Sequence, residues 1–291
     1  MIYTIENEAL KVQISDRGAE MMSIQTKDGT EYLWQGDEKY WGDRALNLFP
    51  YIARMTEGKY TLDGQTYSMD IHGFVKGSVL TAEAQAADRI TLKLTQNRET
   101  LDQYPFDFVY RIRYELEGNR LNIVFSVENP NGRTMYFGIG GHPGFFVPME
   151  KGLSFEDYYL QFDEEKTPVR VGISPTCFVD GNDKEYPLAA GGRIPLAHGL
   201  FDDDAIVLRD MAKAVTIKSD KGAKAVRVEY PQMSYLGIWH MPHTDAPYVC
   251  IEPWSSLPSR QDVVEDLSTQ PGLVHLPAGE SYENRWVIQI F

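Results

Sequence analysis

Polar and apolar residues alternate along most of this chain, and that period of two constrains its fold more than any other feature. Residues 10–15 read Leu-Lys-Val-Gln-Ile-Ser, and related patterns recur at 90–95, 121–127, 215–218, 226–230 and 286–291. Such alternation is typical of a strand with one buried face. Asp63-Gly64 predicts a two-residue hairpin turn, and residues 117–120 predict a slightly longer one.

Helical periodicity is scarce: residues 99–103 predict a short helix, and 261–267 predict a turn. There is no βαβ alternation, internal repeat or low-complexity linker. We therefore predict an all-β fold, one large antiparallel β-sandwich domain over residues 1–291. More than about 40% of residues should be strand and less than about 15% helix, against usual shares near 20–25% and 30–35%. A curved face of such a sandwich is a common place for a small-molecule site.

Composition restricts the partners of this chain. Its formal net charge of −14 argues against binding nucleic acid or an anionic membrane, both of which require a basic surface. Two cysteines without CxxC spacing indicate reduced thiols rather than a disulfide framework. The N-terminus lacks the basic and apolar regions of a signal peptide, and no segment suits a membrane-spanning helix. We expect a cytoplasmic protein, a monomer or homodimer.

His142 and Glu252 are the main candidates for chemistry. An imidazole and a carboxylate can move protons at neutral pH without a metal or cofactor. Pro143 and Pro253 follow them and favour extended backbone at both positions. Each residue also has a structural interpretation, as a hydrogen-bonded histidine or a paired acid. The glycines around His142 favour function, because they would let a small molecule approach the main chain.

Three further positions are candidates for the functional site. His72 precedes a glycine and could bind a substrate hydroxyl or serve as a structural residue. Arg54 lies in an apolar segment, where a buried guanidinium needs a protein carboxylate or ligand oxygens. One carboxylate of the triplet at 202–204 could be functional, although such runs are usually solvated. Among the aromatic residues, Trp239 and Phe145 could offer apolar faces to a small-molecule ligand.

Other motifs fail. His240 and His243 have metal-like spacing, but a proline lies between them and no further ligand follows, so we expect no metal site. The Gly138-x-Gly140 segment lacks the third glycine and the helix of a dinucleotide site. There is no nucleophile elbow or P-loop. His198 and His275 lie in turn-rich sequence and are expected at the surface.

The ordered set Arg54, His72-Gly73, Gly141-His142-Pro143 and Glu252-Pro253-Trp254 resembles the aldose 1-epimerase (galactose mutarotase-like) family, and within it the bacterial LacX-type branch. The resemblance covers essentially the full length. It implies a β-supersandwich and a cofactor-independent isomerase that interconverts the α and β anomers of a free sugar. It also implies that His142 is the general acid and Glu252 the general base, while Arg54 and His72 bind the sugar.

One position departs from the family pattern. Where the galactose enzymes carry an Asp-His pair before a strand, this chain has Asp203-Asp204, and we prefer Asp204 as the substrate-binding residue. Hexose-6-phosphate mutarotases use an arginine cluster, for which only Arg54, Arg44 and Arg260 are candidates. An unphosphorylated sugar is therefore preferred; a hexose-6-phosphate 1-epimerase and a non-catalytic carbohydrate-binding protein are the alternatives. We also expect His142 and Glu252 to face each other across a pocket wide enough to admit a sugar ring.

Overall fold

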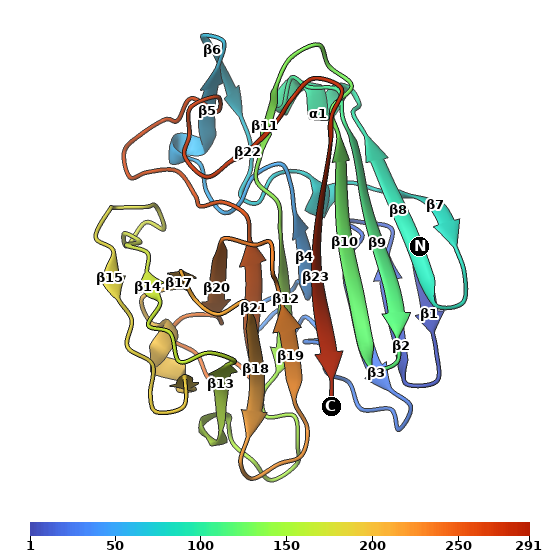
Figure 1. The fold of residues 1–291 in the computed structure, drawn as a ribbon, viewed down its shortest axis with the longest axis vertical. Coiled ribbons are helices and arrows are strands. Elements are labelled where there is room, and N and C mark those ends of the chain that lie inside the picture. The colour runs from blue at the N-terminus through green and yellow to red at the C-terminus, as the bar shows by residue number, and fades with distance from the viewer.

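The structure, a computed structural model, describes residues 1–291 and is nearly all β, with 45% strand and 7% helix (Figure 1). Both values agree with the sequence-based prediction. The α-helix α1 (Arg98–Gln103) lies where the sequence predicted it, and Asn97 caps its N-terminus. No helix has the length and apolar character needed to cross a bilayer.

A nine-stranded antiparallel sheet forms one layer of the sandwich. Its strands, in spatial order, are β16 (Arg193–Pro195), β13 (Tyr158–Phe162), β18 (Ala214–Ser219), β19 (Val226–Glu229), β23 (Ser281–Ile290), β10 (Arg120–Glu128), β9 (Val109–Glu117), β8 (Arg89–Thr95) and β7 (Thr81–Gln85). Five of the alternating segments predicted from sequence, at 90–95, 121–127, 215–218, 226–230 and 286–291, lie on strands of this sheet, although β19 and β23 each end one residue before the predicted segment does. The turn between β9 and β10 is tighter than expected, because only Gly118 and Asn119 separate the strands.

A seven-stranded antiparallel sheet forms the second layer and supplies the site described below. Its strands, in spatial order, are β15 (Lys184–Glu185), β14 (Val169–Arg170), β17 (Ile206–Arg209), β20 (Tyr235–Trp239), β21 (Tyr248–Trp254), β12 (Gly140–Phe146) and β4 (Ala45–Leu48). Neighbours β12 and β21 are about 110 residues apart in sequence, so this pairing depends on the whole topology rather than on a local turn.

Three smaller sheets complete the fold. Their strands are β1 (Ile2–Glu6), β2 (Leu10–Ser15) and β3 (Met21–Thr26) in one, β5 (Lys59–Leu62) and β6 (Gln65–Ser68) in another, and β11 (Met135–Phe137) and β22 (Val274–Leu276) in the third. The predicted hairpin is β5–β6: Leu62 pairs with Gln65, and both Asp63 and Gly64 have positive φ, as a two-residue turn requires.

The two main sheets pack against each other, and one core of 66 buried hydrophobic residues includes side chains from both. Gly141 of β12 lies directly against the indole of Trp286 of β23: a Cβ at Gly141 would be 2.6 Å from Cζ2 of that indole. Val249 and Ile251 of β21 belong to the same core. Because side chains alternate along a strand, Cys250 and Glu252 point to the opposite, outer face of the seven-stranded sheet.

Candidate functional site

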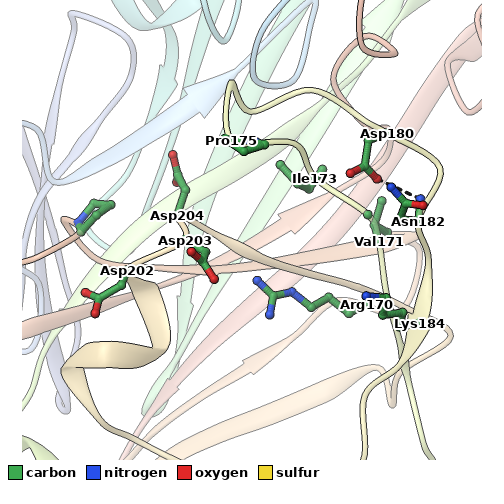
Figure 2. Close-up of a pocket in the computed structure, with 12 residues that line it drawn as sticks. Arg170, Val171, Ile173, Pro175, Asp180, Asn182, Lys184, Asp202, Asp203 and Asp204 are labelled. Atoms are coloured by element: carbon green, nitrogen blue, oxygen red, sulfur yellow. Dashed lines mark hydrogen bonds between the residues drawn. The ribbon is translucent and has the colours of Figure 1, made fainter.

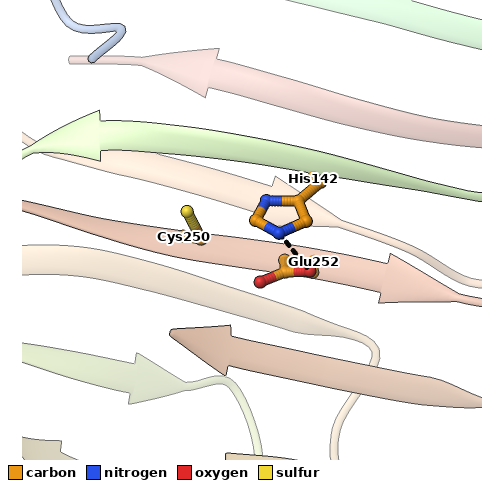
Figure 3. A group of neighbouring side chains, drawn as sticks. All are labelled: His142, Cys250 and Glu252. Atoms are coloured by element: carbon orange, nitrogen blue, oxygen red, sulfur yellow. Dashed lines mark ion pairs between the residues drawn. The ribbon is translucent and has the colours of Figure 1, made fainter. Parts of the chain in front are cut away.

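His142 and Glu252 lie on adjacent strands of the seven-stranded sheet. Gly140 pairs with Trp254 and Gly144 pairs with Cys250 in the β12–β21 register, so His142 falls opposite Glu252 on the outer face. Both residues are in extended backbone, as the prolines after them predicted. Figure 3 shows the imidazole and the carboxylate side by side.

The two groups are much closer than we expected. His142 Nε2 lies 3.2 Å from Glu252 Oε2, and the side chains are only 9% and 2% exposed. The expectation that a sugar ring would fit between them is therefore wrong. The contact between Nε2 and Oε2 is not aligned as a hydrogen bond, because Oε2 of Glu252 is buried with no hydrogen-bond partner. The other ring nitrogen of His142, Nδ1, is also buried without a partner. Both side chains are thus buried polar groups with unused hydrogen-bonding capacity, which in native proteins calls for an explanation such as a catalytic role.

Burial determines the protonation of this pair. Desolvation lowers the pKa of His142 to about 4, although the negative charge of Asp204 acts in the opposite direction. Desolvation raises the pKa of Glu252 well above its ordinary value, and Asp204 adds to that rise. At neutral pH the free protein therefore favours an uncharged pair, a neutral imidazole beside a protonated carboxyl. At neutral pH the pair therefore shares one titratable proton, and it contains one acid and one base.

A cavity of about 500 Å³ opens over the pair, within the range of about 300–1,000 Å³ typical of small-molecule sites. We call it the central cavity. It brings together all five candidate residues from the sequence. Its lining residues are Trp41, Asp43, Leu46, Ala53, Arg54, Ile71, His72, Lys76, His142, Ile173, Cys177, Asp204, Ala205, Val207, Trp239, Met241, Pro242, Glu252, Trp254 and Pro258.

His72 enters the cavity from a loop and is held in an unusual backbone conformation, with φ of 66°. Its Nδ1 accepts a hydrogen bond from the backbone N–H of Ala53 at 3.1 Å, so the ring proton resides on Nε2. Burial lowers its pKa well below 6.5, and the nearby His142 acts in the same direction. His72 is therefore a neutral hydrogen-bond donor beside His142, whose ring centroid is 5.5 Å away.

Asp204 lines the central cavity, whereas its neighbour Asp203 does not. The Asp204 backbone has φ of 69°, and its Oδ1 accepts a hydrogen bond from the N–H of Ala205 at 2.8 Å. The thiol of Cys177 donates to Asp204 Oδ2 at 2.9 Å. Burial, followed by the Asp204 interactions, raises the pKa of Cys177 to about 11, which keeps this thiol protonated as a donor. Sequence reasoning did not identify Cys177.

Arg54 lines the cavity but is exposed, so the expectation of a buried guanidinium is wrong. It forms no ion pair with a protein carboxylate, and neither does Lys76, a second cavity cation that sequence reasoning missed. The other arginines considered for a phosphate do not reach this cavity. Arg260 is instead paired with Glu265, with nitrogen–oxygen distances of 2.8 and 2.9 Å.

Three indole rings supply the apolar walls of the cavity: Trp41, Trp239 and Trp254. The Trp41 ring lies 4.8 Å from that of His142, centroid to centroid, and the Trp239 ring lies 5.7 Å from it. Trp239 was expected here. Phe145 was expected too, but it is fully buried in the core, because it lies three residues after His142 and so points to the other face of β12.

The glycines of β12 serve packing rather than substrate approach, which corrects the sequence interpretation. A Cβ at Gly140 would lie 2.7 Å from the carbonyl oxygen of Pro253, and one at Gly144 would lie 3.2 Å from Trp34 and Trp41. Gly141 faces the core, as described above. These glycines let the strands and the indole rings approach each other closely.

His142, Cys250 and Glu252 are the side chains that could hold a metal ion, with candidate ligand atoms within 4.8 Å of one another (Figure 3). Burial raises the pKa of Cys250 and of Glu252, so both would have to release protons before binding metal. His240 and His243 have separate partners: His240 contacts His198 at 3.1 Å, and His243 lies beside Asp202.

His198 and His275 were both predicted to lie at the surface, and the two predictions have different outcomes. His275 is exposed, as predicted. His198 is half-buried and stacks on Phe155 at 4.2 Å, so its prediction as a surface residue is wrong. Its stacking partner comes from a distant segment, which no local pattern indicated.

Known proteins of similar sequence and structure share this fold. Plasmid-encoded Protein LacX of Lactococcus lactis subsp. lactis is 33% identical over 279 residues, 93% of each chain. A galactose mutarotase related enzyme from Lactobacillus acidophilus is 36% identical, with a TM-score of 0.95 over 100% of this chain and 97% of that one. A galactose mutarotase-like protein from Lactobacillus casei is 31% identical, with a TM-score of 0.95 over 100% of both chains.

The sequence profile of the aldose 1-epimerase family matches residues 1–289, nearly the whole chain. Of the residues that suggested this family from sequence, Arg54, His72, His142, Glu252 and Trp254 line one cavity. The protein belongs to the aldose 1-epimerase family.

Proposed function

We propose that the protein is a mutarotase that interconverts the α and β anomers of a free aldose. The observation that carries the proposal is the buried His142–Glu252 pair, 3.2 Å apart and open to a cavity of about 500 Å³. Family membership supports a sugar epimerase role. The pair supplies an acid and a base together, which is what opening a hemiacetal ring requires.

The close spacing of the pair suits this reaction. Ring opening removes the proton from the C1 hydroxyl and delivers one to the ring oxygen, and both oxygens are bonded to C1. Two groups that exchange protons with neighbouring oxygens must themselves be close together. The sugar would therefore present its C1 edge to both groups from the cavity, rather than lie between them.

In the proposed mechanism, Glu252 accepts the proton of the C1 hydroxyl and His142 donates one to the ring oxygen. The C1–O5 bond breaks as the C1 carbonyl forms. Rotation about C1–C2 presents the other carbonyl face, and closure reverses both proton transfers. These roles require the charged tautomer, in which the shared proton has moved from Glu252 to His142. Each positioned transfer contributes about 10²–10⁴-fold.

The remaining cavity residues would orient the sugar. His72 Nε2 would donate to a sugar oxygen, Asp204 would accept from hydroxyls, and the Arg54 guanidinium would donate to one or two oxygens. Trp41 and Trp239 would cover the C–H face of the ring. No metal or organic cofactor is part of this mechanism.

A phosphorylated hexose is the second candidate, because Arg54 and Lys76 both line the cavity without a carboxylate partner. Against it, Asp43 and Asp204 line the same cavity and would repel a phosphate. We therefore prefer the free sugar.

Polarimetry tests the proposal. Purified protein should accelerate the optical-rotation change of freshly dissolved α-glucose or α-galactose more than that of glucose 6-phosphate. Faster rotation change with the phosphate alone would favour the second candidate. Saturable sugar binding with no rate change for any sugar would instead identify a carbohydrate-binding protein.

A further inference from the structure

Cys250 lies beside the His142–Glu252 pair, and the mechanism proposed above does not use it. It is a free cysteine two residues before Glu252 on β21, opposite Gly144 of β12. Because the side chains of residues i and i+2 point to the same face of a strand, its thiol shares the outer face with the carboxyl group of Glu252. His142, on the neighbouring strand, completes a group of three buried side chains (Figure 3).

The donor atoms of these three side chains have nearly the separations of a zinc site. One donor atom from each lies within 4.8 Å of the others, and Nε2 of His142 is 3.2 Å from Oε2 of Glu252. In a tetrahedral site with zinc–ligand distances of about 2.0–2.3 Å, two ligand atoms are about 3.3–3.6 Å apart. The nitrogen and oxygen already meet this requirement, and the sulfur distances exceed it by at most about 1.2 Å. A zinc ion therefore needs only a small adjustment of the Cys250 side chain.

The chemistry of the three donors selects Zn²⁺. Thiolate, imidazole and carboxylate are the ligands of Zn²⁺ in proteins, whereas Mg²⁺ and Ca²⁺ bind oxygen atoms. Cys250 and Glu252 would each release a proton as the metal binds, and His142 would bind as a neutral imidazole. The two anionic ligands balance the charge of the ion, so the complex would carry no net charge, which suits a buried position.

Two further features favour an ion at this position. Oε2 of Glu252 is buried and accepts no hydrogen bond, so a metal ion would give it the partner that it lacks. His142 and Glu252 also line the central cavity, which supplies an entry path for the ion and room for a water molecule as the fourth ligand.

We infer that Cys250, His142 and Glu252 form a Zn²⁺ site that opens into the central cavity. Zinc bound there would inhibit the protein, because it occupies the two groups that move protons; this part rests on the mutarotase function proposed above. Nδ1 of His142 has no hydrogen-bond acceptor, whereas the second ring nitrogen of a metal-binding histidine usually has one. We therefore expect reversible binding that a chelator removes.

Cobalt and zinc provide complementary probes of this site. Co²⁺ bound to a thiolate gives a charge-transfer band in the near ultraviolet, so it reports whether sulfur is a ligand. We would titrate chelator-treated protein with CoCl₂, followed by absorption, and with ZnCl₂, followed by calorimetry. The wild type should show the thiolate–cobalt band and bind Zn²⁺.

The cobalt band separates this site from the other place where a divalent cation could gather. Asp180, Asp202, Asp203 and Asp204 line a neighbouring cavity of about 620 Å³ (Figure 2). No cysteine or histidine lines that cavity, so cobalt bound by these carboxylates alone would give no thiolate band.

Cys250→Ser keeps the shape of the side chain but supplies no thiolate. It should lose the cobalt band, and its zinc affinity should fall at least about tenfold, since loss of a residue that only supports a ligand already costs about 10–100-fold. Cys177→Ser is the matched control, because Cys177 is the other cysteine of the chain and lies outside the group of three. It should keep the band and the wild-type zinc affinity. Glu252→Gln removes another ligand and should weaken zinc binding as much, so it tests the site even if Cys250→Ser fails to fold.

Polarimetry connects the site to the proposed reaction. Zn²⁺ should slow anomerisation by the wild type, and excess EDTA should restore the rate. Cys250→Ser should anomerise glucose at nearly the wild-type rate and require at least about tenfold more Zn²⁺ for the same inhibition.

The negative results are distinguishable. A wild type without the cobalt band, or a band and zinc affinity that survive in Cys250→Ser, would overturn the metal site. Loss of the band in Cys177→Ser would overturn it too, by assigning the band to the other thiol. Zinc that binds without slowing anomerisation would refute inhibition. If no sugar is anomerised, the mutarotase proposal fails, while the cobalt band and the calorimetry still decide whether the metal binds here.

Discussion

Replacement of Glu252 by glutamine tests the chemistry and the electrostatics of the site together. Glutamine keeps the size and most of the hydrogen-bonding capacity of the side chain, but it cannot accept a proton in turnover. Anomerisation of α-glucose or α-galactose should therefore fall by about 10²–10⁴-fold. The folded structure should remain intact.

The same substitution should stabilise the protein at alkaline pH. Burial holds the pKa of Glu252 well above 4.5, so the folded wild type keeps a proton that the unfolded chain has already released at pH 6.5. Above that pH the unfolded state binds fewer protons than the native state, and the free energy of unfolding falls by up to about 1.4 kcal/mol per pH unit. Glu252→Gln lacks this loss. Between pH 6.5 and 8.5 its stability relative to wild type should therefore increase, by at most that amount for each pH unit.

Urea unfolding at these two pH values, followed by fluorescence, measures the difference. Glu283→Gln is the matched control, because it makes the same substitution at an exposed position on β23, outside the cavity. An equal stability difference between wild type and Glu252→Gln at both pH values would refute the raised pKa. Near-normal turnover by Glu252→Gln on every sugar tested would remove Glu252 as the base.

Four further predictions follow from the same geometry. His142→Asn should lower turnover by about 10²–10⁴-fold, and the double variant with Glu252→Gln should be little worse than either single one, as polarimetry would show. The pH–rate profile should be bell-shaped, with limbs that belong to the pair: a second proton binds on the acid side, and the shared proton is lost on the alkaline side. Asp204→Asn should move both limbs to lower pH, because the Asp204 charge raises both pKa values. Gly141→Ala should cost about 1–3 kcal/mol in thermal unfolding through its clash with Trp286, whereas Gly132→Ala, in open space, should be nearly neutral.

Local patterns were sufficient to predict much of the fold. Strand β2 has the bounds that its alternation indicated, and the β5–β6 hairpin follows from Asp63-Gly64 alone. Extended backbone at His142 and Glu252 followed from the prolines after them. These features depend on residues within a few positions of each other, which is the range that propensity and turn chemistry cover.

Features of the site that depend on side-chain packing could not be predicted in the same way. Trp41 lines the cavity from a loop and Lys76 lines it from the short 3-10 helix Val75–Gly77, and neither local sequence carries a signal of that role. The glycines of β12 were interpreted as room for a substrate, because the indole rings and strands they accommodate come from distant segments. Phe145 is the exception: strand alternation from His142 already placed it on the opposite face.

The distance between His142 and Glu252 was the hardest feature to predict, and it depends on strand register. Moving β21 by one residue against β12 would put Ile251 opposite His142 and turn Glu252 into the hydrophobic core. The inward packing of Val249 and Ile251 prevents that shift, since it would also move those two side chains out of the core to the outer face. The same core contacts that stabilise the sandwich thus hold an acid and a base 3.2 Å apart on its outer face. The burial cost of the two groups is offset by packing elsewhere in the sheets, which is how a protein can maintain an uncharged proton-sharing pair at neutral pH.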